Sequence, residues 1–338
     1  SIGSELVKQC LKFEPSVLVM LEISELNLFE IERKVLGEDS NVLFKPVLSD
    51  IRDLKSLDQI FQEYQPQIVF HAAAYKHVPM QESFPWEAVK TNVFGTNNVA
   101  EISIKHSVEK FVLVSTDKAV KPTNVMGATK RLAEIISQNY NRISPQTDFM
   151  AVRFGNVLGS SGSVIPIFQE QIKNGGPITI TDPDMERYFM SIPEASQLIL
   201  QAGSIGFGGE VFILDMGNPI KILDIASELI RLSGYEPDLD IPIKITGTRP
   251  GEKKIEELAL PTEKLDGTKH DRIFVLNSID SNQDQILKIF KNIEKLKGLS
   301  AISKPNQIRV VLSSVLPEYE PETKVSDPLY IKFKGVEA

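Results

Sequence analysis

The sequence contains few of the residues on which several common protein functions depend. Its 338 residues include one cysteine, Cys10, so no internal disulfide can form, and only four histidines, which leaves little material for a Cys/His metal site. Lys plus Arg number 37 and Asp plus Glu 45, a net charge of −8, and no long basic run could follow a phosphate backbone. A reducing compartment therefore fits best, and we expect neither a bound metal nor a nucleic-acid partner.

Long apolar runs are absent as well. No stretch reaches the roughly 18 apolar residues that span a bilayer, and the N-terminus has no secretory signal. The chain starts without an initiator methionine, at Ser1-Ile2-Gly3, as if inside a motif. We expect a soluble, cytoplasmic fragment, and a membrane anchor at the inner face of the cell membrane could precede it in the intact protein.

What is present is the composition of an ordinary globular protein. Apolar residues make up 42% and charged residues 24%, and the length allows two or three domains or one elaborate α/β domain. Short apolar runs alternate with helix-like segments, which predicts right-handed βαβ units and a doubly wound parallel sheet. In such a sheet ligands bind at the carboxyl ends of the strands. The predicted strands are 16–23, 41–48, 67–73, 110–115 and 149–154.

The pattern changes after Asn156, where turn signals lie close together. A helix over about 193–202 and a strand over 210–216 predict that the chain returns to the sheet, so a smaller substrate-binding region is interleaved with it. We predict a truncated nucleotide-binding domain at 1–157, the substrate-binding region at 158–260 with returning elements near 193–217, and a C-terminal extension at 261–338 with a helix over 283–297.

The first residues contain half of a dinucleotide-binding fingerprint. Ser1-Ile2-Gly3 opens a helical pattern, and the acidic residue Glu22 ends the next strand about 20 positions on. The helix N-terminus would hold a pyrophosphate through its free N–H groups. Glu22 would accept hydrogen bonds from the adenosine ribose and repel a 2′-phosphate, which favours NAD over NADP. Gly3 as a plain turn and Glu22 as an exposed strand end are the alternative at this point.

Other candidate cofactor residues follow the next strands. Asp50 could meet the adenine amino group, and Ile51 could pack on the ring. Small residues at the end of the predicted strand 67–73 would let the backbone approach a cofactor closely, and the polar residue Asn92 lies on the helix beyond them. Each segment alone is more typical of a loop than of a site, but together they follow the order that a nucleotide site requires. These further candidates are Ala72, Ala73, Ala74 and Asn92.

Five longer segments carry a specific resemblance. They are HAAAYKHVP at 71–79, STDKAVKPTN at 115–124, RFGNVLG at 153–159, RYFM at 187–190 and TGTRPGEK at 246–253. The sequence resembles the extended short-chain dehydrogenase/reductase superfamily and, within it, the polysaccharide-biosynthesis family of UDP-N-acetylglucosamine 4,6-dehydratases. The resemblance runs from Ser1 to about Pro321 and implies a Rossmann-like fold. The family's fingerprint has a first strand and two glycines ahead of Ser1, so we expect that strand to be missing here.

The resemblance implies an internal redox elimination on a UDP-sugar. A hydride passes from sugar carbon 4 to NAD and returns to carbon 6, while water leaves from carbons 5 and 6. Asp117 would be the acid for the departing hydroxyl and Lys118 the base for carbon 5. Both roles require neutral forms, which burial and neighbouring charges must favour. A surface ion pair between the two residues is the alternative.

One position departs from the superfamily pattern. Most members use Tyr-x-x-x-Lys, and this sequence keeps the spacing from Met126 to Lys130, but Met126 has no ionisable proton. The departure resembles the long, membrane-associated branch of the dehydratases, whose product retains its configuration at carbon 5. Lys130 can still hold the cofactor ribose, whereas Thr116, Asp117 or a water must take part of the tyrosine's role. Met126 as plain helix packing in an inactive homologue is the alternative.

The resemblance also implies substrate contacts. Asn156 would meet a diphosphate oxygen, and Arg249 and Glu252 would hold the phosphate and the uridine ribose. Ser161 replaces an expected Arg, and Glu186 an expected Thr, which puts contacts from those positions in doubt. A UDP-sugar 4-epimerase and a catalytically inactive nucleotide-sugar-binding homologue stay open as alternatives, and a homo-oligomer is compatible with the sequence. The full set of expected substrate-binding residues is Lys76, Asn156, Arg187, Arg249 and Glu252.

Overall fold

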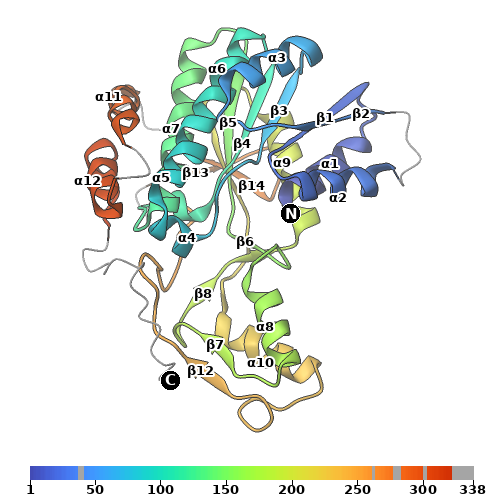
Figure 1. Cartoon of the computed structure of the whole chain (residues 1–338), viewed down its shortest axis with the longest axis vertical. Helices are drawn as coiled ribbons and strands as arrows, with labels where there is room; N and C mark the ends of the chain where they lie inside the picture. The colour runs from blue at the N-terminus through green and yellow to red at the C-terminus, as the bar shows by residue number, and fades with distance from the viewer. Residues whose placement is uncertain (37–41, 261–262, 277–282, 300–302, 322–338) are drawn as a thin grey trace, which may run out of the picture.

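The computed structural model describes residues 1–36, 42–260, 263–276, 283–299 and 303–321. A large α/β body carries a smaller lobe at one end (Figure 1). The body is built on a six-stranded sheet whose order is β13-β14-β10-β5-β4-β3. The four strands from β10 to β3 are parallel, while β14 and β13 extend one edge in antiparallel fashion. The strands are β3 (Ile68–His71), β4 (Lys110–Val114), β5 (Asp148–Arg153), β10 (Val211–Leu214), β13 (Leu265–Gly267) and β14 (Ile273–Leu276).

Two further strands lie beside this sheet as a separate parallel pair. They are β1 (Val17–Glu22) and β2 (Leu43–Leu48), and they align in register from Val17 opposite Leu43 to Glu22 opposite Leu48. Helix α2 (Glu25–Leu36) connects them and packs on both. Within the described residues neither strand pairs with β3, so the nucleotide-binding half consists of two sheets rather than the single sheet that the sequence predicts.

Side chains alternate across the central strands and create two apolar cores. On β4, Phe111 and Leu113 point into the core beneath α7, whereas Val112 points into the core beneath α9. Burial on both faces explains why these strands read as continuous apolar runs. The helices on the first face are α3 (Leu54–Tyr64), α6 (Thr96–Lys105), α7 (Val125–Ile143), α11 (Gln283–Ile293) and α12 (Pro305–Val315), and those on the second are α1 (Ile2–Leu11) and α9 (Ile192–Ile205). The predicted doubly wound α/β fold is therefore confirmed.

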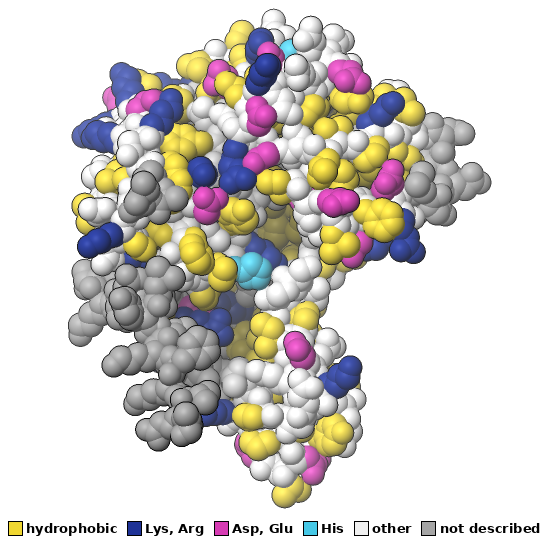
Figure 2. All heavy atoms as spheres, in the orientation of Figure 1, with side chains coloured by type: hydrophobic (Ala, Val, Ile, Leu, Met, Phe, Trp, Pro, Cys, Tyr) yellow, Lys and Arg dark blue, Asp and Glu magenta, His cyan; other side chains and the backbone are white. Residues whose placement is uncertain are grey.

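The smaller lobe has its own core around Phe168, Ile178 and Ile230. Three short two-stranded pairs and two helices form it. These elements are β6 (Asn156–Val157) with β9 (Phe189–Met190), β7 (Ile178–Ile180) with β12 (Ile243–Ile245), β8 (Glu186–Arg187) with β11 (Ile220–Lys221), α8 (Val164–Lys173) and α10 (Ile222–Leu232). Figure 2 shows that the surface is hollowed where body and lobe meet, with Lys and Arg side chains in the hollow.

Short helical elements connect the larger ones. Helices α4 (Val78–Ser83) and α5 (Pro85–Ala88) lead into a π-helix, η1 (Val89–Gly95), and the last helical turn before α12 is η4 (Glu294–Gly298). The predicted helix over 283–297 thus divides into α11 and η4. Within the described residues no helix combines the length and the hydropathy that crossing a bilayer requires.

Candidate functional site

The candidate site lies at the carboxyl ends of β3, β4 and β5. A single turn of 3-10 helix, η2 (Asp117–Ala119), begins two residues after β4, and Thr116 caps its N-terminus. The Asp117 N–H donates to the Phe154 carbonyl oxygen at 3.0 Å, which ties this turn to the segment that follows β5. The sheet edge therefore fixes where the side chains of η2 point.

Asp117 is fully buried, and its two carboxylate oxygens differ. Oδ1 accepts hydrogen bonds from Thr116 Oγ1 at 2.8 Å, from the Lys118 N–H at 2.9 Å and from Lys118 Nζ at 2.9 Å. Oδ2 has no hydrogen-bond partner in the described part of the chain. A buried carboxylate oxygen without a partner is costly. A carboxyl group that gives a proton to a bound ligand needs an oxygen that no protein group occupies, and Asp117 Oδ2 is such an oxygen.

Lys118 is the cation of this group. Its Nζ also donates to Asn156 Oδ1 at 3.3 Å, and Glu256 Oε1 lies 3.9 Å away. Burial lowers the pKa of Lys118, but the charges of Asp117 and Glu256 outweigh burial, and the net shift is upward. The expectation that the surroundings favour a neutral Lys118 is therefore wrong for this arrangement, because two carboxyl groups face one ammonium.

Helix α7 brings Met126 and Lys130 to the same edge. Asn124 Oδ1 caps the helix by accepting from the Gly127 N–H at 2.8 Å. A Cβ at Gly127 would overlap the Lys118 carbonyl oxygen, so only glycine lets α7 rest directly on η2. Met126 is 3% exposed, and Lys130 Nζ donates to the Val114 carbonyl oxygen at 2.7 Å. Burial lowers the pKa of Lys130 to about 8.

Asn92 has a different role from the predicted one. Its Nδ2 donates to the Tyr75 carbonyl oxygen at 3.0 Å and to Thr129 Oγ1 at 3.0 Å, while its Oδ1 accepts from the Tyr75 N–H at 2.8 Å. Both amide hydrogens are therefore used inside the protein. Asn92 joins the loop after β3 to α7 and shapes the cofactor edge without reaching into it.

The remaining predicted cofactor residues lie at the same edge, with one correction. Gly3 faces Ala72, since a Cβ on Gly3 would lie 3.9 Å from the Ala72 Cβ. Glu22 Oε1 accepts from the Ser24 N–H at 2.9 Å, and the Asp50 carboxylate is paired with Arg52. Ile51, expected to pack on adenine, is 7% exposed and packs in the core. Ser1, Ile2, Ala73 and Ala74 complete the predicted set, with Ser1 and Ala73 exposed and Ile2 and Ala74 partly buried.

The predicted substrate residues differ in their surroundings. Lys76 Nζ is 3.4 Å from Ser160 Oγ, and Arg249 is exposed, with Glu252 Oε2 accepting from its backbone N–H at 3.0 Å. Arg187 is only 7% exposed, and its guanidinium N–H groups donate to backbone carbonyl oxygens. Arg187 therefore holds the segment after Arg249 against β8, and its expected contact with substrate is not supported by this geometry.

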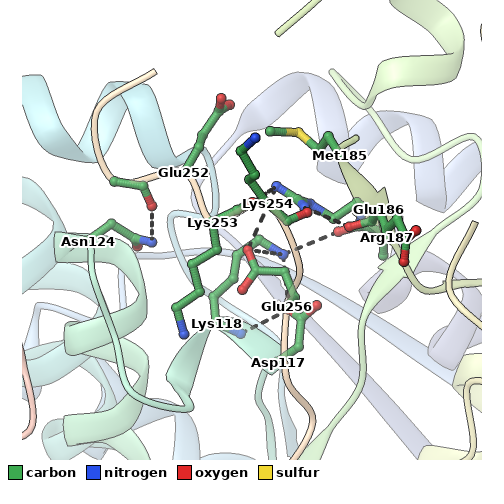
Figure 3. A network of polar contacts seen from close by, with 12 residues as sticks. Asp117, Lys118, Asn124, Met185, Glu186, Arg187, Glu252, Lys253, Lys254 and Glu256 are labelled. Carbon is green, nitrogen blue, oxygen red and sulfur yellow. Dashed lines mark hydrogen bonds and ion pairs between the residues drawn. The ribbon is translucent and has the colours of Figure 1, made fainter. Parts of the chain in front are cut away.

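Glu256 is the site residue that the sequence analysis missed. It is 3% exposed and lies between Lys118 and Arg187, as Figure 3 shows. The segment KKIEEL at 253–258 follows the TGTRPGEK segment directly, but no spacing in it singles out one carboxyl group. Within the described residues no group of three or more His, Cys, Asp and Glu side chains could hold a metal ion.

Solved structures share this fold. Pen from Bacillus thuringiensis superposes with a TM-score of 0.74 at 36% identity, over 82% of this chain and 85% of that chain. DesIV from Streptomyces venezuelae, a dTDP-glucose 4,6-dehydratase solved with NAD bound, superposes with a TM-score of 0.64 at 20% identity, over 76% and 84% of the two chains. The fold is thus that of the Rossmann-like, extended short-chain dehydrogenase/reductase class.

Curated relatives identify the family. The capsular polysaccharide biosynthesis protein CapD of Staphylococcus aureus is 48% identical over 88% of this chain, and the probable polysaccharide biosynthesis protein EpsC of Bacillus subtilis is 46% identical over 88%. A UDP-glucose 4-epimerase of Rickettsia massiliae is 37% identical over 78% of this chain and 76% of its own length. The family model for polysaccharide biosynthesis proteins matches residues 1–278, and the chain belongs to that family. It spans 51% of CapD and 49% of EpsC, about half the length of these relatives.

Proposed function

We propose that the chain acts as an NAD-dependent nucleotide-sugar 4,6-dehydratase, a hydro-lyase that converts UDP-N-acetylglucosamine to the UDP-4-keto-6-deoxy sugar for polysaccharide synthesis. One observation carries the proposal. A fully buried carboxyl group, Asp117, has one unpartnered oxygen and is hydrogen-bonded through the other to the Lys118 ammonium at a strand end where substrates bind in this fold. Membership of the polysaccharide biosynthesis family supports it.

The residues at the sheet edge fit NAD. Gly3 faces Ala72 with room for a close approach of backbone to cofactor, Glu22 ends β1 where a ribose would lie, and Lys130 is buried beside Val114. When bound, the cofactor supplies hydride transfer at sugar carbons 4 and 6. With its pKa lowered to about 8, Lys130 is still mostly protonated at pH 7, so its ammonium can donate to a ribose hydroxyl.

The pair Asp117 and Lys118 can reach the neutral forms by one internal step. A proton that passes from Lys118 Nζ to Asp117 across their 2.9 Å hydrogen bond leaves a neutral amine and a neutral carboxyl group. The amine then takes the proton from carbon 5, next to the ketone. The carboxyl group gives its proton to the hydroxyl that leaves carbon 6, so one water forms and a double bond joins carbons 5 and 6.

The 4-hydroxyl needs a different partner, because Met126 cannot accept its proton. Thr116 Oγ1 already donates to Asp117 Oδ1 at 2.8 Å and accepts from the Lys118 N–H at 3.4 Å, so one lone pair remains for the substrate. We assign Thr116 to orient the 4-hydroxyl, whose proton leaves to a water, because Asp117 takes its single proton from Lys118. Arg249, Glu252, Lys76 and Asn156 would surround the UDP portion in the hollow.

The decisive test is proton NMR of UDP-N-acetylglucosamine with NAD and the protein in deuterated buffer. A 4-keto-6-deoxy product with deuterium at carbon 5 is the expected result, because the base exchanges its proton with solvent. The coupling pattern at carbon 5 should show retained configuration. Absence of any conversion, despite calorimetric binding of NAD, would overturn the proposal in favour of an inactive homologue.

A UDP-sugar 4-epimerase is the second candidate, and the similarity to the UDP-glucose 4-epimerase of Rickettsia massiliae favours it. Epimerisation needs no acid and base for carbons 5 and 6. Conversion of the substrate to its galacto epimer would therefore support this candidate, and so would Asp117→Asn and Lys118→Met variants that keep turning over. Homo-oligomerisation and attachment of the protein to the cytoplasmic face of a membrane stay predictions.

A further inference from the structure

Glu256 is a buried carboxyl group that the mechanism above does not use. It lies on the loop between β12 and β13 and reaches over η2 from the side of the lobe (Figure 3). Its side chain is 3% exposed. The loop is held there by other contacts, since Lys253 Nζ donates to the Val120 carbonyl oxygen at 2.9 Å and the Arg187 guanidinium donates to the Lys253 and Lys254 carbonyl oxygens. The position of Glu256 is therefore set without its carboxylate.

The carboxylate of Glu256 makes charge contacts but no close hydrogen bond. Oε1 lies 3.9 Å from Lys118 Nζ and 4.0 Å from Arg187 Nη2, both longer than a hydrogen bond. Oε2 has no partner in the described part of the chain. Burying such a group costs stability, because water is removed and no hydrogen bond replaces it. Stability therefore does not explain why the Glu256 carboxylate is buried here, and a role in the chemistry of the site would explain it.

Five charged groups meet at this point. Asp117 and Lys118 come from η2, Arg187 from β8, and Lys253 and Glu256 from the loop. Burial raises the pKa of Glu256, Asp117 raises it further, and Lys118, Arg187 and Lys253 oppose the rise. For Lys118, burial is outweighed first by Asp117 and then by Glu256. Two carboxyl groups thus hold one ammonium, and only Asp117 is hydrogen-bonded to it.

We propose that Glu256 is a positioning residue that holds the Lys118 ammonium by charge and sets the pH at which Lys118 can give up its proton and act as a base. The proposal rests on the proposed function, in which Lys118 takes the proton from carbon 5. Glu256 acts against the proton transfer from Lys118 to Asp117, because that transfer removes the positive charge that Glu256 attracts. In the absence of substrate the pair therefore stays charged.

The test is the pH dependence of kcat and KM for UDP-N-acetylglucosamine in the wild type and in Glu256→Gln. Glutamine keeps the size and removes the charge. We expect the ascending limb of the kcat profile to move to lower pH by about one unit, with KM unchanged, because a charge at 3.9 Å no longer favours the ammonium. Glu256→Asp, which keeps the charge, should stay nearer to the wild-type midpoint.

Glu257→Gln is the matched control. Glu257 is the next residue, is partly buried, and makes no hydrogen bond or ion pair among the described residues. The pH profile of kcat for Glu257→Gln should coincide with that of the wild type. If Glu256→Gln lowers kcat by the same factor at every pH, with no movement of the limb, then Glu256 only supports the loop and the proposal is wrong.

A second measurement separates this proposal from the dehydratase assignment. The Lys118 side chain can be titrated by carbon NMR of lysine-labelled protein without substrate, with Lys118→Met to assign its signal. The pH at the midpoint of the Lys118 titration should be lower in Glu256→Gln than in the wild type, and it should be unchanged in Glu257→Gln. A protein that gives no 4-keto product but shows this fall contradicts the proposed function alone. A protein that gives the product while the midpoint is unchanged contradicts the role of Glu256.

Discussion

Two buried charge clusters lie side by side after β4, and they differ in how their carboxylate oxygens are satisfied. Ser115 begins the first cluster and donates to Glu134 Oε1 at 2.6 Å. Arg153 donates to both oxygens of Glu134, at 2.8 and 2.7 Å, and Arg131 donates to Oε2 at 3.1 Å. Burial raises the pKa of Glu134, but the charge and hydrogen bonds of Arg153 outweigh it and lower the pKa to about 2.

The second cluster begins two residues further on, at Asp117. Here Asp117 Oδ2 and Glu256 Oε2 have no partner among the described residues, and burial raises the pKa of Glu256. Both clusters lie after the end of β4 in a low-dielectric surrounding, so burial alone does not explain why their carboxylate oxygens differ in hydrogen bonding. Both carboxylate oxygens of Glu134 are satisfied, which makes that cluster part of the framework, whereas the carboxylate oxygens without partners leave the Asp117 cluster ready to bind a ligand.

The largest expected effect is the loss of turnover in Asp117→Asn. Asparagine can accept the same hydrogen bonds at one atom but cannot give a proton, so kcat for the proposed dehydration should fall by about 10²- to 10⁴-fold. The free energy of unfolding should fall less than it does in Glu134→Gln, because Lys118 keeps Glu256 as a second counter-charge. Denaturant unfolding and kinetics check both. The exposed Asp271, changed in the same way, should alter neither quantity.

Glu134→Gln should show the opposite pattern. It removes the charge that two arginines share, and Arg153 would be left as a buried cation without a counter-ion. We expect the free energy of unfolding to fall by about 3 to 5 kcal/mol. Urea unfolding at pH 7 measures this change, and Glu101→Gln on the exposed side of α6 is the control, expected within about 0.5 kcal/mol of wild type. A stable Glu134→Gln variant would remove the distinction between the two clusters.

The same carboxylate predicts how stability depends on pH. The Glu134 pKa is lowered from 4.5 to about 2, so its contribution is fully present above about pH 4.5 and is lost as the pH falls toward 2. The difference corresponds to about 3 kcal/mol. Burial lowers the pKa of His71 from 6.5 to about 3, so His71 reduces the stability of the protein as the pH falls from about 6.5 toward 3, but it does so equally in wild type and Glu134→Gln. The gap between their unfolding free energies should therefore narrow from pH 5 to pH 3, and a constant gap would contradict the assignment.

Gly127→Ala tests how the second cluster is held against α7. A Cβ at this position would overlap the Lys118 carbonyl oxygen, so α7 and η2 must separate. The overlap should cost about 1 to 3 kcal/mol of stability, in spite of alanine's better helix propensity. Turnover should fall as well, because Lys118 moves relative to Lys130. Gly298→Ala, where the new Cβ would have open space around it, should leave both unchanged.

The parts of this arrangement differ in how far the sequence predicts them. The strands before the site follow from uninterrupted apolar runs such as 111–114, and Asp117 and Lys118 are found because they come shortly after such a run ends. The antiparallel strands β13 and β14 are missed, since three- and four-residue strands such as LDG at 265–267 carry too few residues for a periodic signal.

Side-chain partners are predicted least well, because they depend on packing between segments distant in the sequence. Arg187 is a residue type that often binds phosphate, but here its guanidinium donates to backbone carbonyl oxygens. Ile51, expected to contact adenine, packs in the core against Gly95. Glu256 meets Lys118 only after the chain has passed through the whole lobe. No local sequence pattern predicts the contact between Glu256 and Lys118, so only the folded structure shows it.

The smallest expected effect is that of Thr116→Val. The change keeps the shape and removes one of the three hydrogen bonds that Asp117 Oδ1 accepts. One such bond contributes about 0.5 to 1.5 kcal/mol, so kcat should fall about two- to tenfold if Thr116 only orients its neighbours. Thr116→Ser keeps the hydroxyl group and should restore most of the rate. A fall of more than about 10³-fold in Thr116→Val, with stability unchanged, would instead make the Thr116 hydroxyl an obligatory route for the 4-hydroxyl proton. Either size of effect should leave the hydrogen bonds of the Glu134 cluster unaltered, because Ser115 and not Thr116 donates to Glu134.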